Sequence, residues 1–275
     1  HKRILVYLKY TKLESIVVIK IGGNIIDDEK ALSDFLSDFS AIPFPKILIH
    51  GGGKIATQLS GELNIEPKMV DGRRITDEKT IDIVTMVYAG LINKKMVAKL
   101  QAKGCDAIGL TGADANIIEA HKRIHQHIDF GFVGDVDQVH AAFIHDLLLK
   151  KYTPVIAPIT HDKKGNLLNT NADTMASQIA IELSKTKKVS FFYCFEKNGL
   201  LEDVENPESL IARIKLSDVN QLKEKQIITG GMIPKVDNIV DAIEKGVEKV
   251  ILCHAKNVLS IVSENAKFGT TFTRN

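Results

Sequence analysis

The chain contains no tryptophan, few cysteines and no long apolar run, and each absence argues against a class of protein. The three cysteines are odd in number and show no Cys-x-x-Cys spacing, so neither a disulfide framework nor a zinc site is expected. No apolar stretch approaches the ~18 residues that a membrane helix needs. We therefore expect a protein of a reducing cytoplasm that has no membrane partner.

An excess of charge of one sign is also missing. The chain has 36 Lys and Arg residues and 34 Asp and Glu residues, which gives a formal net charge of +2. So small an excess provides no general attraction for nucleic acid, which is not expected as a partner. The 275 residues are 44% hydrophobic and 25% charged. This is the composition of a globular protein with one large domain or two lobes.

Short β-rich apolar runs alternate with helix-like stretches along the chain. The predicted strands span residues 16–21, 46–50, 107–110, 155–158, 189–193 and 250–253, and the predicted helices span 31–40, 55–63, 77–103, 172–183 and 236–245. This alternation predicts an α/β fold with a mostly parallel sheet sandwiched by helices.

Two further features concern the organisation of that fold. Positions 81, 84, 88, 91, 95 and 98 in the longest predicted helix are near helical spacing and are expected to share one face. The polar turn 162–165 is the predicted boundary between an N-terminal lobe, 1–165, and a C-terminal lobe, 166–275.

Three glycine clusters carry most of the functional signal. They are Lys20-Ile-Gly-Gly23, His50-Gly-Gly-Gly53 and Gly230-Gly-Met-Ile-Pro-Lys235. Ligands of parallel sheets lie beyond the carboxyl ends of the strands, which is where these clusters are expected. The first and third each combine flexible backbone N–H groups with one lysine. Two such segments can hold a phosphoryl group from opposite sides.

The glycine triplet is not a Walker P-loop, because Leu48 stands at the first glycine position and Ile55 at the Ser/Thr position. Gly51-x-Gly53-x-x-Ala56 matches a relaxed dinucleotide fingerprint, but the acid expected about twenty residues on, Asp71, falls in a turn. A Rossmann dehydrogenase is therefore the weakest reading. A plain turn needs one glycine rather than three, which favours anion binding at a helix N-terminus.

Lys20 interrupts an apolar strand, where an unpaired ammonium is costly to desolvate. An anionic partner is the simplest explanation for Lys20 and for Lys235. The segment Asn169-Thr-Asn171-Ala-Asp173 has two readings that spacing does not separate. Asn171 or Asp173 caps the following helix, or Asp173 lies between the two lysines and orients both ammonium groups.

Arg73 and Arg74 follow a turn glycine and are either surface charges or a fork for a carboxylate. The nine histidines show no metal-ligand spacing, and no serine or cysteine has a convincing His and Asp partner. Neither a metal site formed by the protein nor a catalytic triad is predicted.

Several long motifs, in this order, closely resemble the amino-acid kinase family. They are Lys20-Ile-Gly-Gly23, Ile49-His-Gly-Gly-Gly53, Asp71-Gly-Arg-Arg-Ile-Thr-Asp77, Thr111-Gly-Ala-Asp114, Asp129-Phe-Gly-Phe-Val-Gly-Asp135, Pro154-Val-Ile-Ala-Pro158, Leu168-Asn-Thr-Asn-Ala-Asp173 and Gly230-Gly-Met-Ile-Pro-Lys235. The similarity covers residues 16–260. The Gly-Arg-Arg-Ile-Thr and Asn-x-Asn-Ala-Asp pieces resemble the branch that phosphorylates N-acetyl-L-glutamate in arginine biosynthesis.

The resemblance implies ATP as phosphoryl donor, acylglutamate binding and dimerisation in the N-terminal lobe, and ATP binding in the C-terminal lobe. Lys20 and Lys235 would stabilise the transferring phosphoryl group, and Asp173 would hold both lysines. The residues implied in binding the acylglutamate or the phosphoryl group are Gly23, Gly52, Gly53, Arg74 and Asn169. Those implied in contacts with ATP are Gly22, Glu196, Lys197, Gly199, Leu200, Gly230, Gly231 and Met232.

A carboxylate acceptor agrees with the absence of a candidate base. A carboxyl group with a pKa of about 4.3 is ionised at pH 7 and needs no deprotonation. The remaining difficulty is to bring an anion to an anionic triphosphate. Catalysis is then positioning and charge neutralisation, with Mg²⁺ held mainly by the ATP phosphates.

Departures from the family pattern leave alternatives open. The nucleotide turn, residues 195–199, has Phe195 where family members usually carry a hydroxyl, which admits a non-catalytic sensor of nucleotide or amino acid. Arg73 replaces a usually neutral residue, and a second guanidinium would suit the extra carboxylate of N-succinyl-L-glutamate. Residues 1–14 and the tail 263–272 differ from those of arginine-inhibited members. An arginine-insensitive homodimer is therefore expected.

Overall fold

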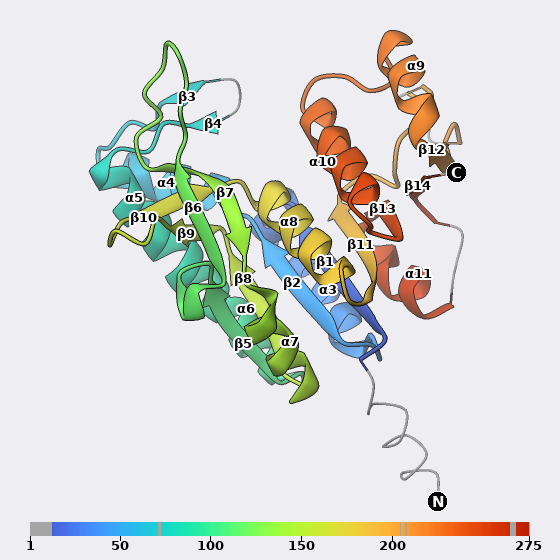
Figure 1. Ribbon diagram of the computed structural model, residues 1–275, viewed down its shortest axis with the longest axis horizontal. Coiled ribbons are helices and arrows are strands. Elements are labelled where there is room, and N and C mark those ends of the chain that lie inside the picture. The colour runs from blue at the N-terminus through green and yellow to red at the C-terminus, as the bar shows by residue number, and fades with distance from the viewer. Residues whose placement is uncertain (1–12, 71–72, 204, 207, 265–267, 275) are drawn as a thin grey trace, which may run out of the picture.

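The computed structural model of the chain describes all residues except 1–12, 71–72, 204, 207, 265–267 and 275. Within these residues, eight strands form one sheet in the order β12-β14-β13-β11-β1-β2-β8-β5 (Figure 1). The strands are β1 (Ser15–Ile21), β2 (Lys46–His50), β5 (Ala107–Thr111), β8 (Thr153–Ala157), β11 (Lys188–Phe195), β12 (Arg213–Lys215), β13 (Lys249–His254) and β14 (Thr270–Thr273). Neighbouring strands pair in parallel except β13 and β14. The predicted mostly parallel α/β sheet is confirmed.

Helices cover both faces of this sheet. One face packs against α3 (Glu29–Ala41), α5 (Glu78–Thr85), α6 (Asn93–Gln101) and α11 (Val258–Glu264). The other packs against α7 (Ala141–Leu149), α8 (Ala172–Ser184) and α10 (Met232–Glu244). Three further helices are α2 (Gly23–Asp27), α4 (Gly53–Glu62) and α9 (Val219–Glu224), of which Figure 1 labels α4 and α9.

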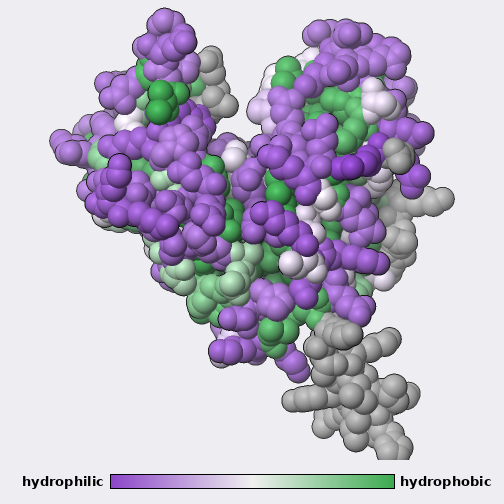
Figure 2. Space-filling view, in the orientation of Figure 1, coloured by the Kyte–Doolittle hydropathy of each residue, from purple (hydrophilic) through white to green (hydrophobic). Residues whose placement is uncertain are grey.

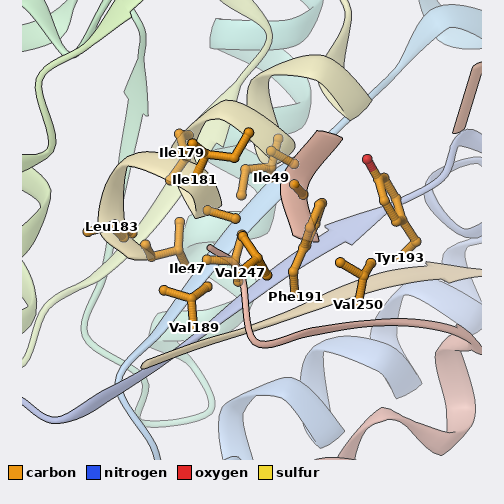
Figure 3. Packing of buried hydrophobic residues seen from close by; sticks show 14 of the residues in the cluster. Ile47, Ile49, Ile179, Ile181, Leu183, Val189, Phe191, Tyr193, Val247 and Val250 are labelled. Carbon is orange, nitrogen blue, oxygen red and sulfur yellow. The ribbon is translucent and has the colours of Figure 1, made fainter. Parts of the chain in front are cut away.

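Strand alternation in β1 divides its side chains between two cores. Ile16 and Val18 pack in the cluster beneath α8 and α10, whereas Val17 and Ile19 pack in the cluster beneath α3. Figure 3 shows the first cluster, with Phe191 among its members. Each fully buried aliphatic or aromatic side chain stabilises the fold by about 1.5–3 kcal/mol. The sheet is thus a rigid support for residues at the strand ends.

Four further strands close into a small barrel within the described residues. They are β6 (Ile118–Lys122), β7 (Val133–Val139), β9 (Ile159–His161) and β10 (Leu167–Thr170). The turn 162–165 joins β9 to β10, and these strands pair antiparallel. The turn proposed as a lobe boundary thus lies inside one hairpin of the barrel. The division into 1–165 and 166–275 stays a prediction.

The long helix predicted at 77–103 is present, but its middle is π-helical. α5 leads into a π-helical segment, Met86–Ile92, which leads into α6. Tyr88 and Ile92 face the core, whereas Leu91 and Lys95 are exposed. Ala98 is exposed as well. The expectation that positions 91, 95 and 98 share one face with positions 81, 84 and 88 is therefore wrong. The wider π-turn rotates the residues that follow it, and such segments often lie at functional sites.

Candidate active site

The carboxyl ends of the parallel strands β1, β2, β8 and β11 lie at one edge of the sheet. The first two glycine clusters follow β1 and β2 directly, and the turn 196–200 follows β11. Figure 2 shows the surface hollowed at the top of the view, between the part that carries β3 (Met69–Val70), β4 (Arg73–Arg74) and β6 and the part that carries α9 and α10.

An ion-paired cluster of Lys20, Asp173 and Lys235 lies at this edge. Strand alternation places Lys20 on the same face of β1 as Ile16 and Val18, against α8. The Lys20 Nζ lies 2.6 Å from Asp173 Oδ1, and the Lys235 Nζ lies 2.8 Å from Asp173 Oδ2. The three side chains are only 11%, 20% and 17% exposed. One carboxylate thus holds two ammonium groups that come from opposite ends of the chain.

Electrostatics keep the Asp173 carboxyl ionised. Burial alone would raise the pKa of Asp173, but Lys20 and Lys235 outweigh it and hold that pKa well below its usual range. Burial lowers the pKa of Lys235, with Asp173 opposing the shift and Lys20 adding to it. Two positive charges against one negative charge leave the cluster with a net positive charge that suits an anionic ligand.

The helix α8 and the strand β11 position this cluster. Asn171 caps α8, because its Oδ1 accepts hydrogen bonds from the backbone N–H groups of Asp173 and Thr174. Asn171 rather than Asp173 therefore caps the helix with its side chain, and the Asp173 carboxylate pairs with the two lysines. The Tyr193 hydroxyl donates to the Asp173 carbonyl at 3.2 Å, and the Tyr193 ring centroid lies 4.7 Å from Lys235 Nζ. Figure 3 shows Tyr193 at the edge of the core cluster.

Two of the glycine segments open helices at the same edge. Gly23 begins α2, and Gly52 is the N-cap of α4. The first N–H groups of a helix lack intrahelical partners and attract anions. The Gly22 N–H, in contrast, donates to the Cys194 carbonyl at 3.1 Å and is already used. Lys54 links the two segments, because its Nζ donates to Asn24 Oδ1 in α2 at 2.5 Å.

A cavity of about 230 Å³ adjoins the glycine triplet. It is lined by Gly51, Gly52, Gly53, Met69, Arg74, Tyr88, Arg123, Val133, Pro158, Asn169, Thr170, Asn171 and Ala172. The buried Arg74 donates from Nη2 to the Gly53 carbonyl at 3.0 Å and to Thr57 Oγ1 at 2.7 Å. Its Nη1 is buried without a hydrogen-bond partner among the described residues. A buried unpaired donor is costly, and a ligand carboxylate would satisfy it.

Asn169 lies in the same cavity and donates from Nδ2 to Thr76 Oγ1 at 3.1 Å. The Thr76 that receives this bond forms a bridge with Gly131, where a Cβ would lie 2.3 Å from the Thr76 carbonyl oxygen. The glycine of the 129–135 motif is therefore needed for a close backbone contact that supports the cavity. Arg73 pairs with Val70 in the β3–β4 hairpin, but its side chain lies outside the described part of the structure.

Sequence reasoning missed two polar residues of the cavity. Arg123 lies against Asp135, with its Nε 3.1 Å from both carboxylate oxygens and its Nη2 2.5 Å from Oδ1. Tyr88 comes from the π-helical segment, and burial raises its pKa while Arg74 opposes the shift. Arg123 directly follows strand β6 of the barrel, which places it at the cavity. Nothing in its local sequence distinguishes it from a surface charge.

Most of the residues expected to contact ATP lie just after the carboxyl end of β11 or at the start of α10, and Gly22 follows β1. Glu196 and Lys197 are exposed, whereas Gly199 and Leu200 are buried. The Leu200 N–H donates to Thr270 Oγ1 at 2.8 Å, and a Cβ at Gly199 would lie 2.5 Å from that same oxygen. Thr270, which no sequence motif singled out, thus anchors this turn.

The third glycine segment leads into α10. Gly230 has a positive φ of 50°, and Gly231 is the N-cap before Met232. A Cβ at either glycine would meet no atom within 4 Å, so this segment is open to a ligand. Lys235 lies in the first turn of α10, so the same segment that carries the two glycines also carries the ammonium that pairs with Asp173.

Two observations concern what the described residues do not form. They include no group of three or more His, Cys, Asp or Glu side chains able to hold a metal ion. None of the helices in the described part of the chain is long and apolar enough to cross a bilayer. The three cysteines are buried free thiols. The arrangement can therefore neutralise and position anions, using two ammonium groups, a guanidinium and backbone N–H groups.

Comparisons with known proteins agree with this geometry. The model of the amino acid kinase family matches residues 15–254. The acetylglutamate kinase of Cytophaga hutchinsonii is 51% identical over 264 residues, which cover 96% of this chain and 100% of that protein. The acetylglutamate kinase of Bacteroides fragilis is 47% identical over 251 residues, which cover 91% of this chain and 96% of that protein.

A solved structure gives the same result for the fold. A Streptococcus mutans protein is 25% identical with a TM-score of 0.77, and the match covers 94% of this chain and 99% of that one. The family match spans β1 to β13 and includes all three glycine clusters with both lysines. This chain belongs to the amino acid kinase family.

Proposed function

We propose that this protein transfers the γ-phosphoryl group of ATP to the side-chain carboxylate of N-acetyl-L-glutamate, in arginine biosynthesis. The single observation that carries the proposal is Asp173 bridging Lys20 and Lys235 beside a cavity with the unpaired donor of Arg74. Acetylglutamate kinases that match nearly the whole chain give the substrate.

The acylglutamate is bound before reaction by groups of the cavity. Arg74 Nη1 binds the α-carboxylate of the acylglutamate, which satisfies a donor that is otherwise buried and unpaired. Asn169, which also lines the cavity, binds the substrate as well. The side-chain carboxylate, which is not held by Arg74, is then free to approach the phosphoryl group.

In the chemical step, a carboxylate oxygen attacks the γ-phosphorus while the bond to the β,γ-bridging oxygen breaks. The products are the acyl phosphate and ADP, and no proton is transferred. Lys20 and Lys235 neutralise charge on the transferring group, and Asp173 keeps both ammonium groups in place. The N–H groups of Gly23, Gly52 and Gly53 donate to the reacting oxygens.

The nucleotide binds along the turn 196–200 and the segment Gly230–Met232. The Met232 and Ile233 N–H groups already donate to the Thr229 and Gly230 carbonyls, so the Gly230 and Gly231 N–H groups, which have no described backbone acceptor, are the ones proposed to meet phosphate oxygens. Because the described residues offer no cluster of metal ligands, Mg²⁺ is held mainly by the ATP phosphates, where it neutralises charge.

Homodimerisation and a cytoplasmic location are parts of the same proposal. Met86 and Leu91 on the long helix are 55% and 44% exposed, which supports a subunit contact in the N-terminal half. Buried free thiols are typical of a reducing compartment. Light scattering of the purified protein tests the dimer, and a monomeric mass would contradict it.

The decisive experiment is acyl-phosphate formation from MgATP, trapped with hydroxylamine, with N-acetyl-L-glutamate and N-succinyl-L-glutamate compared side by side. Turnover of the N-acetyl substrate far above the N-succinyl substrate supports the proposal. The reverse preference would assign the enzyme to a succinylated pathway. Binding of ATP without turnover of either substrate would contradict the kinase and support a sensor.

A further inference from the structure

A buried hydrogen-bond chain lies behind the glycine triplet. His50, the last residue of β2, is fully buried, and its Nδ1 lies 2.8 Å from the Gly51 carbonyl oxygen. Its Nε2 lies 3.1 Å from Nδ2 of Asn93, which is the first residue of α6 and is also buried. The same Asn93 Nδ2 donates to the Val155 carbonyl in β8 at 2.9 Å. Three elements of the fold are thus joined beneath the cavity.

The partners fix which ring nitrogen of His50 carries the proton. A carbonyl oxygen only accepts, so Nδ1 must donate to Gly51, and Nε2 then accepts from Asn93. Burial lowers the pKa of His50 to about 4, although the hydrogen bond to Gly51 opposes the shift. The ring is therefore neutral at pH 7, with one donor and one acceptor, and both are used.

The hydrogen bond from His50 to the Gly51 carbonyl also sets the direction of the Gly52 N–H group. The Gly51 carbonyl and the Gly52 N–H belong to one peptide unit, which is planar and trans, so they point in opposite directions. Because His50 holds the carbonyl toward the core, the Gly52 N–H points to the other side, where the cavity lies. No described residue accepts a hydrogen bond from this N–H.

Packing around the chain leaves it little freedom. A Cβ at Gly52 would lie 2.3 Å from Ile92 Cδ1, which belongs to the π-helical segment. A Cβ at Gly109, in β5, would lie 2.0 Å from Asn93 Oδ1. A glycine inside a strand weakens the strand, and here it makes room for the amide that holds His50. Asn93 Oδ1 in turn accepts from Lys94 Nζ at 3.3 Å, which orients the amide.

We propose that His50, held by Asn93, is a positioning residue that aims the Gly52 N–H at the anionic group reacting in the cavity. His50 does not touch the substrate; it fixes the peptide unit whose N–H does. The inference rests on the proposed phosphoryl transfer and adds a residue that acts behind the catalytic groups. A donor fixed in advance stabilises developing charge without reorganisation.

Two substitutions separate the two hydrogen bonds of the ring. In His50→Asn the side-chain amide can reach the position of Nδ1, which keeps a donor for Gly51 but loses the bond to Asn93. In His50→Gln the amide can reach the position of Nε2, which keeps the bond to Asn93 but loses the donor to Gly51. Both remove one buried hydrogen bond, so each is the control for the other.

The expected result is a loss of kcat in His50→Gln of about tenfold to a hundredfold, because a misdirected donor costs less than a deleted one. KM for ATP and for the acylglutamate should change by less than about threefold, since ground-state contacts remain. His50→Asn should retain most of kcat. Equal losses in the two variants, or losses confined to KM, would show a merely structural histidine.

A measurement on the unmodified protein covers the case in which a variant fails to fold. Nitrogen NMR of the protein labelled with ¹⁵N-histidine should show His50 as the neutral Nδ1–H tautomer at pH 7. The Nε2–H tautomer, or a charged ring, would overturn the proposal. The Gly52 amide resonance should shift in His50→Gln far more than in His50→Asn.

These readouts also distinguish this proposal from the function it rests on. If the wild-type protein forms no acyl phosphate, the kinase proposal fails. The proposal that the Gly52 N–H points at a reacting group then fails with it. The tautomer and the Gly52 amide shift then show whether the geometry itself is right. If the wild type is active but His50→Gln is equally active, only the present inference fails.

Discussion

The glycine triplet Gly51–Gly53 and the segment Gly230–Gly231 differ in how the fold supports them. Gly52, the middle glycine of the triplet, is packed from behind by Ile92 and Tyr88, and the Gly51 carbonyl is held by His50, although a Cβ at Gly51 or Gly53 would meet no atom within 4 Å. The other segment has open space where its side chains would be. The half of the cleft proposed to bind the acyl-amino acid is thus held by packing at Gly52 and by a hydrogen bond, whereas the half proposed to bind the nucleotide has open space at both glycines.

This difference has a chemical reason. The acceptor is a small molecule whose carboxylates must be placed to within a fraction of an ångström for attack. ATP brings many charges and a large surface of its own. The positive cluster Lys20–Asp173–Lys235 joins both halves, and we propose that the phosphoryl group passes from one half to the other beside it.

The largest expected effect comes from breaking the cluster that joins the halves. Lys20→Ala or Lys235→Ala should lower kcat by a factor on the order of a hundred to a thousand, because each removes charge stabilisation of the transition state. KM for both substrates should change much less. Steady-state kinetics measure both. The matched control is Lys223→Ala, which breaks a Lys223–Asp237 ion pair of 2.6 Å at the more exposed side of α10 and should leave kcat unchanged.

The next largest effect should be confined to binding of the acylglutamate. Arg74→Ala removes the buried guanidinium and should raise KM for the acylglutamate by a factor on the order of a hundred, since a buried charge-paired contact is lost. KM for ATP should stay within about threefold, because the ligand that Arg74 is proposed to bind is the acylglutamate and not the nucleotide. An equal rise in both KM values would disprove the assignment of Arg74 to one half.

Alanine at the two kinds of glycine tests the comparison directly. Gly52→Ala places a Cβ 2.3 Å from Ile92 Cδ1 and should destabilise the protein by about 1–3 kcal/mol. Gly231→Ala adds a Cβ in open space at a φ of −65° and should be neutral or stabilise by about 0.4–1 kcal/mol. Urea unfolding compares the variants. The double variant Gly52→Ala/Ile92→Val should recover part of the loss, and no recovery would contradict the packing argument.

The pH dependence of the free energy of unfolding should report the ion pairs that Asp173 forms with Lys20 and Lys235. The folded-state pKa of Asp173 is depressed, so its contribution is present above the unfolded-state pKa near 4 and is lost as pH falls below it. Urea unfolding from pH 6 down to pH 3 should show that the wild type loses about 1–2 kcal/mol more than Asp173→Asn. Parallel curves for the two proteins would mean that the lysines do not hold this carboxyl.

The smallest expected effect concerns the anchor of the nucleotide turn. Thr270→Val removes the oxygen that accepts the Leu200 N–H and should raise KM for ATP by about threefold to tenfold, the equivalent of one modest hydrogen bond. KM for the acylglutamate should not change. If the acylglutamate KM rose instead, the turn 196–200 would not belong to the nucleotide half.

Local patterns predicted most of the fold and many of the side chains that meet in the cleft. The alternating apolar runs gave the parallel sheet, because buried strands have few polar residues whatever their neighbours are. Lys20 stood out because an ammonium in an apolar strand requires a partner, and the structure supplies Asp173. Leu91 was misplaced because helical spacing assumes an α-helix, and a π-turn is set by packing around it.

Other residues could not be found from local patterns. Arg123 and Tyr88 reach the cavity only because the barrel and the long helix pack there. His50 was expected only as the end of a strand before the glycine triplet. Its proposed positioning role depends on Asn93, which lies 43 residues away in the chain. Such partners are joined by the fold and share no sequence motif.

The sequence by itself determined six strands of the main sheet, the three glycine clusters and the charged residue types that an anion-handling site needs, but neither the barrel strands nor β12 and β14. These depend on local backbone freedom and on the cost of burying an unpaired charge, which each residue carries with it. Only the tertiary structure decided that one carboxylate serves two lysines, that Arg74 keeps one donor unpaired, and that His50 rather than solvent holds the Gly51 carbonyl. Those outcomes depend on distances between segments far apart in the chain, and close packing sets such distances.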